Sequence, residues 1–358
     1  MRSFGVEEEL LLVAPSSGIP VALAESVTHG AGDDAPEREL QRQQVETGTA
    51  PCRALDELSG RLRARRDAAA KAARRAGSEV AALATSPRAV TPSTTPDERY
   101  LRMAEEYALT AQEQLTCGCH VHVSIESEDE AVAVLDRVRP WLAPLLAMTG
   151  NSPFWQERDS GYDSYRYQVW GRWPSAGPTE VFGTPKLYHD IVRSMVESGA
   201  LLDEGMIYFD ARLSRRYPTV EVRVSDVCLL ADDAVLLAAL VRGLVETAAR
   251  EWRSGEPLVP VRTELLRLAS WRASRSGLAG ELIHPVTERP APAEVVVRAL
   301  LEHVAPALAD AGDLAVATGL VERLLERGNG AALQRRVYAE TGDLSAVVNA
   351  AVARTLVG

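Results

Sequence analysis

Phe4-Gly-Val-Glu-Glu-Glu-Leu-Leu-Leu-Val13 is an apolar, strand-like run that contains three consecutive carboxylates. Side chains alternate between the two faces of a strand, so Glu7 and Glu9 share one face while Glu8 lies on the other. Two like charges on a half-buried face repel, and burying them costs free energy unless a cation compensates. The segment is therefore either a solvated edge strand or one wall of a cation site.

Residues 116–125, TCGCHVHVSI, form a second segment with strand-like alternation. Period two places His120 and His122 on one face and Cys117 and Cys119 on the other. A zinc site of the Cys/His kind needs its ligands on one side, so this spacing argues against such a site. Two histidines at i and i+2 are still candidates for a metal ligand, and the pattern does not say which of them would hold the ion.

Two further segments carry charged residues that could bind a metal ion or an anionic group. Residues 217–227, YPTVEVRVSDV, read as a strand with Glu221 and Arg223 on one face. These two could form a plain ion pair, or the guanidinium could bind an anionic group such as a phosphoryl beside a metal-bound carboxylate. Residues 39–46, ELQRQQVE, offer two carboxylates seven residues apart. They would share a face of a helix, but the spacing decides nothing if the segment is bent or partly a strand.

Five motifs, four of them within the segments above, resemble in their order along the chain the carboxylate–amine ligases of the YbdK type. That family is also called glutamate–cysteine ligase type 2 and is a branch of the glutamine-synthetase-like superfamily. The similarity extends through essentially the whole chain and includes C-terminal stretches at 277–285 and 339–344. The motifs are FGVEEELLLV (4–13), ELQRQQVET (39–47), GCHVHVS (118–124), GNSPFWQERDSGYDSYRYQVWGRWP (150–174) and PTVEVRVSDV (218–227).

The resemblance implies a metal-dependent site on a curved antiparallel sheet that forms an active-site funnel. Matched motif by motif, the metal ligands would be Glu7, Glu9, Glu39, Glu46, His120 and Glu221. His122 is the less favoured imidazole ligand, and Arg223 would contact phosphate. Oxygen ligands with one imidazole suit hard cations that bridge nucleotide phosphates, so ATP with two or three Mg²⁺ or Mn²⁺ ions is expected.

The resemblance also implies the reaction. A substrate carboxylate would attack the γ-phosphate of ATP, and an amine would convert the acyl phosphate into an amide with release of ADP and phosphate. Glutamate is the expected acid, and cysteine or another amine the expected acceptor. Metal ions and Arg223 would offset the charge of the transferring phosphoryl group. The absence of a G-x-S-x-G elbow and of a Walker A motif agrees with a reaction that needs no protein nucleophile.

Two rival functions come from other classes. A metal-dependent amidohydrolase is one, because a strand His-x-His also occurs in such sites. A catalytically silent, nucleotide-binding relative is the other. A zinc-supported hydrolysis of amides without ATP would favour the first, whereas bound nucleotide without turnover would favour the second.

Residues 151–174 concentrate aromatic and arginine side chains in a chain whose aromatic content is only 5%. Such a segment could be a substrate lid, a packed loop or a dimer contact, since loops carry specificity on a rigid scaffold. Arg166 is the candidate for a substrate carboxylate and for a catalytic role, and Trp155 and Tyr165 are candidates for neighbouring substrate contacts.

The fold class expected from these patterns is α+β. Residues 1–230 should form a catalytic sheet with covering helices, and 231–358 a helical C-terminal lobe packed on the same unit. Apolar periodicity predicts helices over the following ranges: 55–76, 97–114, 129–149, 185–204, 232–253, 256–276, 292–311, 313–327 and 342–356. The first and third would cover the back of the sheet, and 30–38, with Asp33 and Asp34, would be an exposed connecting loop.

The composition limits the kinds of binding partner that are expected. A net charge of −11 disfavours nucleic-acid binding despite the arginine-rich run at 61–75. Four cysteines in 358 residues do not form a disulfide framework. Without a signal-like leader or an 18-residue apolar run, a soluble cytoplasmic protein with no membrane partner is expected. Its partners would be small amino acids or amines, and a homodimer is expected from the family alone.

Overall fold

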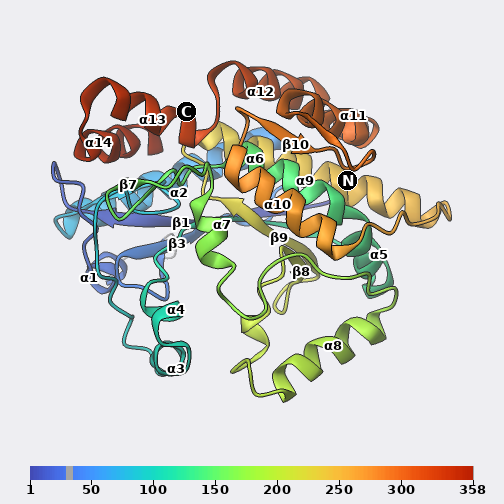
Figure 1. The fold of residues 1–358 in the computed structure, drawn as a ribbon, viewed down its shortest axis with the longest axis horizontal. Coiled ribbons are helices and arrows are strands. Elements are labelled where there is room, and N and C mark those ends of the chain that lie inside the picture. Colours follow the sequence, from blue (N-terminus) through green and yellow to red (C-terminus); the bar gives the residue numbers. More distant parts are fainter. Residues whose placement is uncertain (30–34, 358) are drawn as a thin grey trace.

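A computed structural model describes residues 1–29 and 35–357, and Asp33 and Asp34 lie outside the described residues. Its centre is a seven-stranded sheet in which all paired neighbours are antiparallel (Figure 1). The strands follow the order β2 (Glu37–Arg38), β3 (Gln44–Gly48), β1 (Phe4–Val13), β5 (Gly118–Ser124), β9 (Thr219–Asp226) and β8 (Ala211–Leu213), with β4 (Glu79–Ala81) paired to one end of β1. The predicted α+β class with an antiparallel sheet is confirmed.

Strand β1 separates its carboxylates as alternation predicts. Glu7 and Glu9 line a cavity on one face of the sheet. Glu8 is fully buried on the other face, where its carboxylate forms an ion pair with Arg66 of α2 (Leu55–Arg75) at 2.6 Å. The third acidic residue of the run is therefore part of the core.

Four helices cover the back of the sheet. They are α2, α5 (Glu128–Val138), α6 (Leu142–Thr149) and α9 (Ala231–Arg253). Figure 1 places them on one side of the strands, with α3 (Glu98–Tyr107), α4 (Leu109–Gln112) and α8 (Pro185–Glu197) on the other. Helix α9 packs on α5, β5 and β1 although it begins the expected C-terminal lobe, so one apolar core joins both parts of the chain.

Several helix boundaries differ from prediction for identifiable reasons. The predicted 129–149 helix is divided by a 3₁₀ turn at Arg139–Trp141 that contains Pro140, which lacks an N–H for the helix ladder. Residues 97–114 divide into α3 and α4 at Ala108, whose φ is +46°. Helix α10 begins at Thr263 because Pro257 and Pro260 precede it.

The remaining elements are short or C-terminal. The helices are α1 (Ala24–Thr28), α7 (Tyr165–Trp170), α10 (Thr263–Ser276), α11 (Ala293–Ala311), α12 (Leu314–Arg327), α13 (Gly330–Thr341) and α14 (Leu344–Thr355), with a 3₁₀ turn at Glu204–Met206. Two hairpins pair β6 (Phe154–Trp155) with β7 (Arg158–Asp159) and β10 (Glu281–Ile283) with β11 (Pro290–Pro292). Helix α8 ends at Glu197, short of the predicted 204, and α13 was not predicted.

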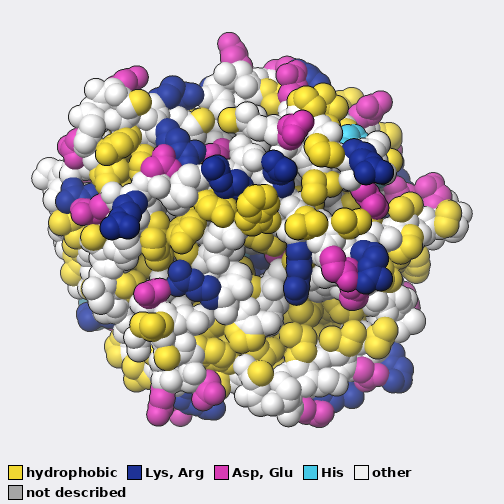
Figure 2. All heavy atoms as spheres, in the orientation of Figure 1, with side chains coloured by type: hydrophobic (Ala, Val, Ile, Leu, Met, Phe, Trp, Pro, Cys, Tyr) yellow, Lys and Arg dark blue, Asp and Glu magenta, His cyan; other side chains and the backbone are white. Residues whose placement is uncertain are grey.

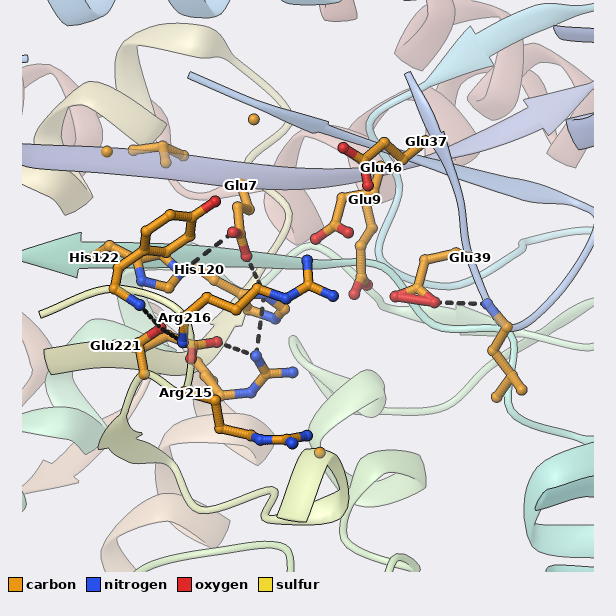
Figure 3. A pocket seen from close by; sticks show the side chains of 18 of the residues that line it. Glu7, Glu9, Glu37, Glu39, Glu46, His120, His122, Arg215, Arg216 and Glu221 are labelled. Atoms are coloured by element: carbon orange, nitrogen blue, oxygen red, sulfur yellow. Dashed lines mark hydrogen bonds and ion pairs between the residues drawn. The ribbon is translucent and has the colours of Figure 1, made fainter. Parts of the chain in front are cut away.

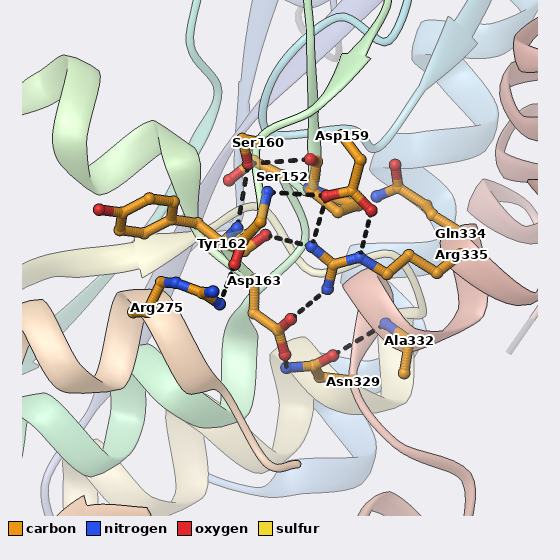
Figure 4. Close-up of polar contacts among 12 residues, drawn as sticks. Ser152, Asp159, Ser160, Tyr162, Asp163, Arg275, Asn329, Ala332, Gln334 and Arg335 are labelled. Carbon is orange, nitrogen blue, oxygen red and sulfur yellow. Dashed lines mark hydrogen bonds and ion pairs between the residues drawn. The ribbon is translucent and has the colours of Figure 1, made fainter. Parts of the chain in front are cut away.

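Helix α13 is held by polar contacts to the segment that leads into α7 (Figure 4). Arg335 pairs with Asp159 at 2.9 Å and with Asp163 at 2.5 Å. Asn329, at the start of the helix, donates to the other oxygen of Asp163 at 3.0 Å. These contacts pack the part of the aromatic segment around Asp159 and Asp163 against the C-terminal helices.

The surface charges are mixed in sign, and the cysteines form no disulfide framework, as the composition predicts. On the face shown in Figure 2, acidic and basic side chains are interspersed. All four cysteines are buried and unpaired. Among the described residues, no helix combines the length and apolarity that a membrane crossing requires.

Candidate active site

A cavity of about 1430 Å³ opens on the face of the sheet opposite α9. Its floor is formed by β1, β3, β5 and β9. Its walls come from α3, from the turn around Asp203 to Gly205, and from residues 214–218 between β8 and β9. All six predicted metal ligands, together with His122 and Arg223, line this cavity.

Strand register brings the predicted ligands together. Glu7 lies opposite His120 and Glu9 opposite Glu46. Across the next pair of strands, His122 lies opposite Glu221. Glu39 precedes β3, so the chain reversal between β2 and β3 closes the seven-residue gap that its spacing from Glu46 left undecided.

These side chains form three overlapping groups, each with ligand atoms within 4.8 Å of one another. Figure 3 shows the carboxylates and imidazoles converging from several strands. Glu46 belongs to two of the groups and Glu7 to two, so the groups form a row. They are Glu9, Glu39 and Glu46; Glu7, Glu46 and His120; and Glu7, His122 and Glu221.

Backbone and arginine donors hold individual carboxylates in place. The Gly118 amide donates to Glu9 at 2.6 Å, and the Leu40 amide donates to Glu39 at 2.6 Å. Arg212 of β8 grips Glu221 with two N–H groups, at 2.8 and 3.3 Å. Arg223 pairs with the same carboxylate from its own strand. The carboxylates are thus preorganised by donors outside the predicted ligand set.

The electrostatics of the row differ from end to end. Burial, followed by the charge of Glu9, raises the pKa of Glu39 to about 7. Burial and the neighbouring carboxylates also raise the pKa of Glu46 well above its usual range. Burial opposes ionisation of Glu221 too, but the charges of Arg223 and Arg212 outweigh it and keep that pKa low. One end of the row therefore lacks compensating positive charge.

Hard divalent cations fit this donor set. The row offers carboxylate oxygens from Glu39 and Glu46, which burial and mutual repulsion disfavour as free anions. It also offers the buried Nε2 atom of His120, which has no hydrogen-bond partner among the described residues, and that of His122, which faces Glu7 at 3.3 Å. Burial and the nearby Arg223 lower the pKa of His120, which keeps its imidazole neutral and able to ligate.

Further cavity residues were not predicted from the sequence. Tyr100 donates to Glu39 at 3.4 Å, and Arg99 of the same helix pairs with Asp203 at 2.7 Å across the cavity wall. Trp170 lies 5.9 Å from the Arg223 guanidinium, measured to the ring centroid. Short helices and single aromatic residues carry little periodic signal, so only the folded chain identifies these contacts.

The predicted substrate contacts of the aromatic segment lie elsewhere. Arg166 is 1% exposed; its guanidinium lies 3.9 Å from Asp226 and 5.4 Å from the ring centroid of Trp170. Trp155 and Tyr165 pack on each other with ring centroids 5.7 Å apart. None of the three lines the cavity formed by the described residues, whereas Trp170 and Trp173 of the same segment do. The roles of Arg166, Trp155 and Tyr165 in binding substrate, and of Arg166 in catalysis, stay predictions without a supporting contact.

Comparison with known proteins identifies the family of this chain. The model for glutamate–cysteine ligase family 2 (GCS2) matches residues 3–350. The chain belongs to this family. A provisionally named glutamate–cysteine ligase 2-1 of Streptomyces avermitilis is 57% identical over 360 residues, covering 99% of each chain. A provisionally named glutamate–cysteine ligase 2 of Streptomyces coelicolor is 55% identical, with the same coverage of both chains.

Solved structures share the fold of this family member at low sequence identity. A bifunctional glutathione synthetase from Pasteurella multocida has a TM-score of 0.72 at 14% identity, and the match covers 99% of this chain and 52% of that one. A glutamate–cysteine ligase from Francisella tularensis, solved with AMP, has a TM-score of 0.67 at 14% identity, covering 100% and 89%. By its family the chain is an ATP-dependent ligase, which decides against the amidohydrolase alternative.

Proposed function

We propose that this ligase joins the carboxylate of glutamate to the amine of cysteine or of another small amine, through an acyl phosphate. The observation that carries the proposal is the row of three clusters of carboxylate and imidazole side chains, which lies beside Arg223 in one cavity. The names of similar proteins, glutamate–cysteine ligases, support glutamate and cysteine as the first substrates to test.

The residues account for the requirements of the reaction. Bound Mg²⁺ or Mn²⁺ would offset phosphate charge at the row, held by Glu7, Glu9, Glu39, Glu46, Glu221 and the imidazoles. The buried Arg223 guanidinium faces the same cavity and can bind oxygens of a phosphoryl group through its planar fork. Arg212 donates a hydrogen bond to the Glu221 carboxylate, which also forms an ion pair with Arg223. Arg212 therefore holds this carboxylate in place.

The bond changes then need no protein nucleophile. A substrate carboxylate oxygen forms a bond to the γ-phosphorus while the bond from phosphorus to the ADP oxygen breaks. The amine nitrogen next attacks the acyl carbon, phosphate leaves with the former carboxylate oxygen, and the nitrogen releases a proton to solvent or phosphate. The enclosing walls favour this order by limiting hydrolysis of the acyl phosphate.

The experiment that tests the proposal is phosphate release from Mg²⁺–ATP across amino acids supplied singly and in pairs, with mass spectrometry of the products. Glutamate with cysteine, or with another amine, should release phosphate and yield an amide of the summed mass minus water. Glu9→Gln should abolish turnover. Glu37→Gln is the matched control, because Glu37 lines the cavity rim but belongs to none of the three groups.

Two outcomes would contradict the proposal. Phosphate release without an amide would indicate an ATPase, and nucleotide binding without release for any pair would indicate the silent relative. Full activity in Glu9→Gln would separately refute the assignment of the metal-binding row.

A further inference from the structure

The cavity extends past the row of carboxylates into an enclosed and uncharged pocket. Gln44 of β3 lies opposite Leu11 in the strand register, two residues from Glu46, so alternation places its side chain on the same face as that carboxylate. The pocket, which we call the glutamine pocket, is lined by Gln44, Tyr100, Met103, Gln114, Trp173 and Tyr208. None of these six side chains is charged at neutral pH, in contrast to the row beside them.

Three polar groups in the glutamine pocket are buried without a partner. Gln44 is 4% exposed, and its amide forms no hydrogen bond with the described residues. Gln114 donates an amide N–H to Thr116 at 2.6 Å, which leaves its buried carbonyl oxygen unpaired. The indole N–H of Trp173, a residue that is 2% exposed, has no acceptor among residues 1–29 and 35–357. Buried polar groups are nearly always paired, so these groups indicate the place of a bound polar molecule.

Contacts across the pocket hold its walls together. The Tyr107 ring meets the Trp173 ring edge-on, with centroids 5.2 Å apart, and Tyr208 packs on Trp173 with centroids 5.6 Å apart. Arg172 pairs with Glu113 at 2.6 Å. These contacts join α3 and the end of α4 to the segment that follows α7. Aromatic walls with a few polar groups suit a small molecule that has a compact apolar part.

The missing partners define the chemistry of that molecule. The carbonyl oxygens of Gln44 and Gln114 require donors, whereas the Trp173 N–H requires an acceptor. An amino acid offers both, through its amine and its carboxylate, but a simple amine offers only donors. A charged side chain would be costly to bury among the uncharged lining, because it would lack a counter-charge. The pocket therefore suits an amino acid whose side chain is small and uncharged.

The charges at the edge of the pocket disfavour the acid substrate. Glutamate carries a net negative charge, and this end of the row holds the carboxylates of Glu46 and of Glu39, which accepts from Tyr100 at 3.4 Å. Arg99 on the cavity wall does not compensate, because it already binds Asp203 through two N–H groups at 2.7 and 3.2 Å. A zwitterionic acceptor has no net charge and is not repelled in this way.

We propose that the glutamine pocket binds the acceptor of the ligase, that this acceptor is an amino acid with a small uncharged side chain, and that Gln44 and Trp173 determine this specificity. The inference rests on the proposed function and narrows its acceptor. The nitrogen of the bound amino acid attacks the acyl carbon, and phosphate leaves with the electron pair of the broken bond. The nitrogen then loses a proton to solvent or phosphate.

A substrate panel tests the class of acceptor. With Mg²⁺–ATP and glutamate, kcat/KM for L-2-aminobutyrate and L-cysteine should exceed that for propylamine and cysteamine, which lack only the carboxylate, by about 10–100-fold. L-Aspartate and L-lysine, whose side chains are charged, should be poor acceptors. Hydroxylamine at high concentration is the control, because it converts an acyl phosphate into a hydroxamate and is too small to need the pocket.

Variants test the location. Gln44→Met and Trp173→Phe keep most of the side-chain bulk but remove the polar group, so each should raise the KM for L-2-aminobutyrate about 10-fold. The KM for glutamate and the rate of hydroxamate formation should not change. Trp271→Phe, at an exposed tryptophan that does not line the cavity, is the matched control. Circular dichroism checks folding, and if Trp173→Phe is not folded, Gln44→Met decides.

The contrary results separate the pocket from the reaction. If hydroxamate forms, equal kcat/KM for the amino acids and their decarboxylated counterparts, a preference for aspartate or lysine, or no amide with either uncharged amino acid would overturn the acceptor class. An unchanged acceptor KM in both variants would overturn the location, and a parallel rise in the KM for glutamate would make the two residues merely structural.

A wild type that forms no hydroxamate would refute the ligase reaction itself. Tryptophan fluorescence titrated with L-2-aminobutyrate then decides about the pocket. Binding that is about 10-fold weaker in Gln44→Met would support it, whereas equal affinity in the variant, or no binding to the wild type, would overturn it.

Discussion

The ion pair between Glu8 and Arg66 offers a direct test of how β1 divides its carboxylates. Arg66 donates to both carboxylate oxygens, at 2.8 and 2.6 Å, and both side chains are buried. Glu8→Gln keeps the shape but leaves the guanidinium without its counter-charge. Removing one partner of a buried pair costs about 3–5 kcal/mol, because the remaining charge is uncompensated.

At roughly 2 °C per kcal/mol for a long chain, that loss corresponds to a drop in Tm of about 6–10 °C. Calorimetry on the metal-free protein measures it without contributions from bound ions. Glu9→Gln, one residue along the strand, is the matched control. It removes one of several repelling charges in the cavity, so its Tm should be unchanged or higher while Mn²⁺ binding falls.

The same reasoning predicts a rescue. Replacing both partners, as in Glu8→Leu with Arg66→Met, should return the Tm most of the way to the wild-type value, because no unpaired charge is left. An unchanged Tm in Glu8→Gln, or a double variant no more stable than the single one, would refute this account. Below its Tm, Glu8→Gln should keep its cation binding.

Three further outcomes are expected. Burial raises the pKa of Asp210 to about 7, so the folded state retains a proton that the unfolded chain releases near pH 4, and stability falls as the pH rises between these values. Between pH 5 and pH 8 this loss amounts to about 3 kcal/mol, at 1.36 kcal/mol per pH unit over the two units below pH 7. Asp210→Asn should remove it, as measured by comparing urea unfolding at pH 5 and pH 8. Gly118→Ala would place a Cβ 2.3 Å from a guanidinium nitrogen of Arg166, so it should cost about 1–3 kcal/mol in thermal unfolding and weaken Mn²⁺ binding at the adjacent His120. Mn²⁺ at a hundred times its Kd should stabilise the wild type by about 2.7 kcal/mol per site, and EDTA should reverse the rise in Tm.

Strand alternation is a local property, and the residues that depend on it alone were predictable. Glu7 and Glu9 share the cavity face, and Glu221 and Arg223 share a face of β9, as the sequence indicates. Arg212 was not predictable in this way. Its strand has three residues, too few for a periodic signal, and its place opposite Glu221 follows from hairpin register.

Helix α13 escaped prediction for a related reason. Its buried residues are Gly330, Ala331 and Gln334, which do not form an apolar stripe, and two glycines at its start favour a turn. Polar contacts from Arg335 and Asn329 to Asp163 hold it instead. Such contacts join positions more than 160 residues apart in the chain, so no local pattern reveals them.

The hydrogen bonds that Arg66 donates have a consequence for how the chain folds during its synthesis on the ribosome. Besides Glu8 of β1, its guanidinium donates to the carbonyls of Cys228, Leu229 and Thr355, the last of them at the end of α14. A growing chain can complete this set only after residue 355 has left the ribosome. The strand that carries Glu7 and Glu9 is therefore fully anchored only by Thr355, which is made more than 340 residues after them, so a nascent chain should need protection from aggregation until then.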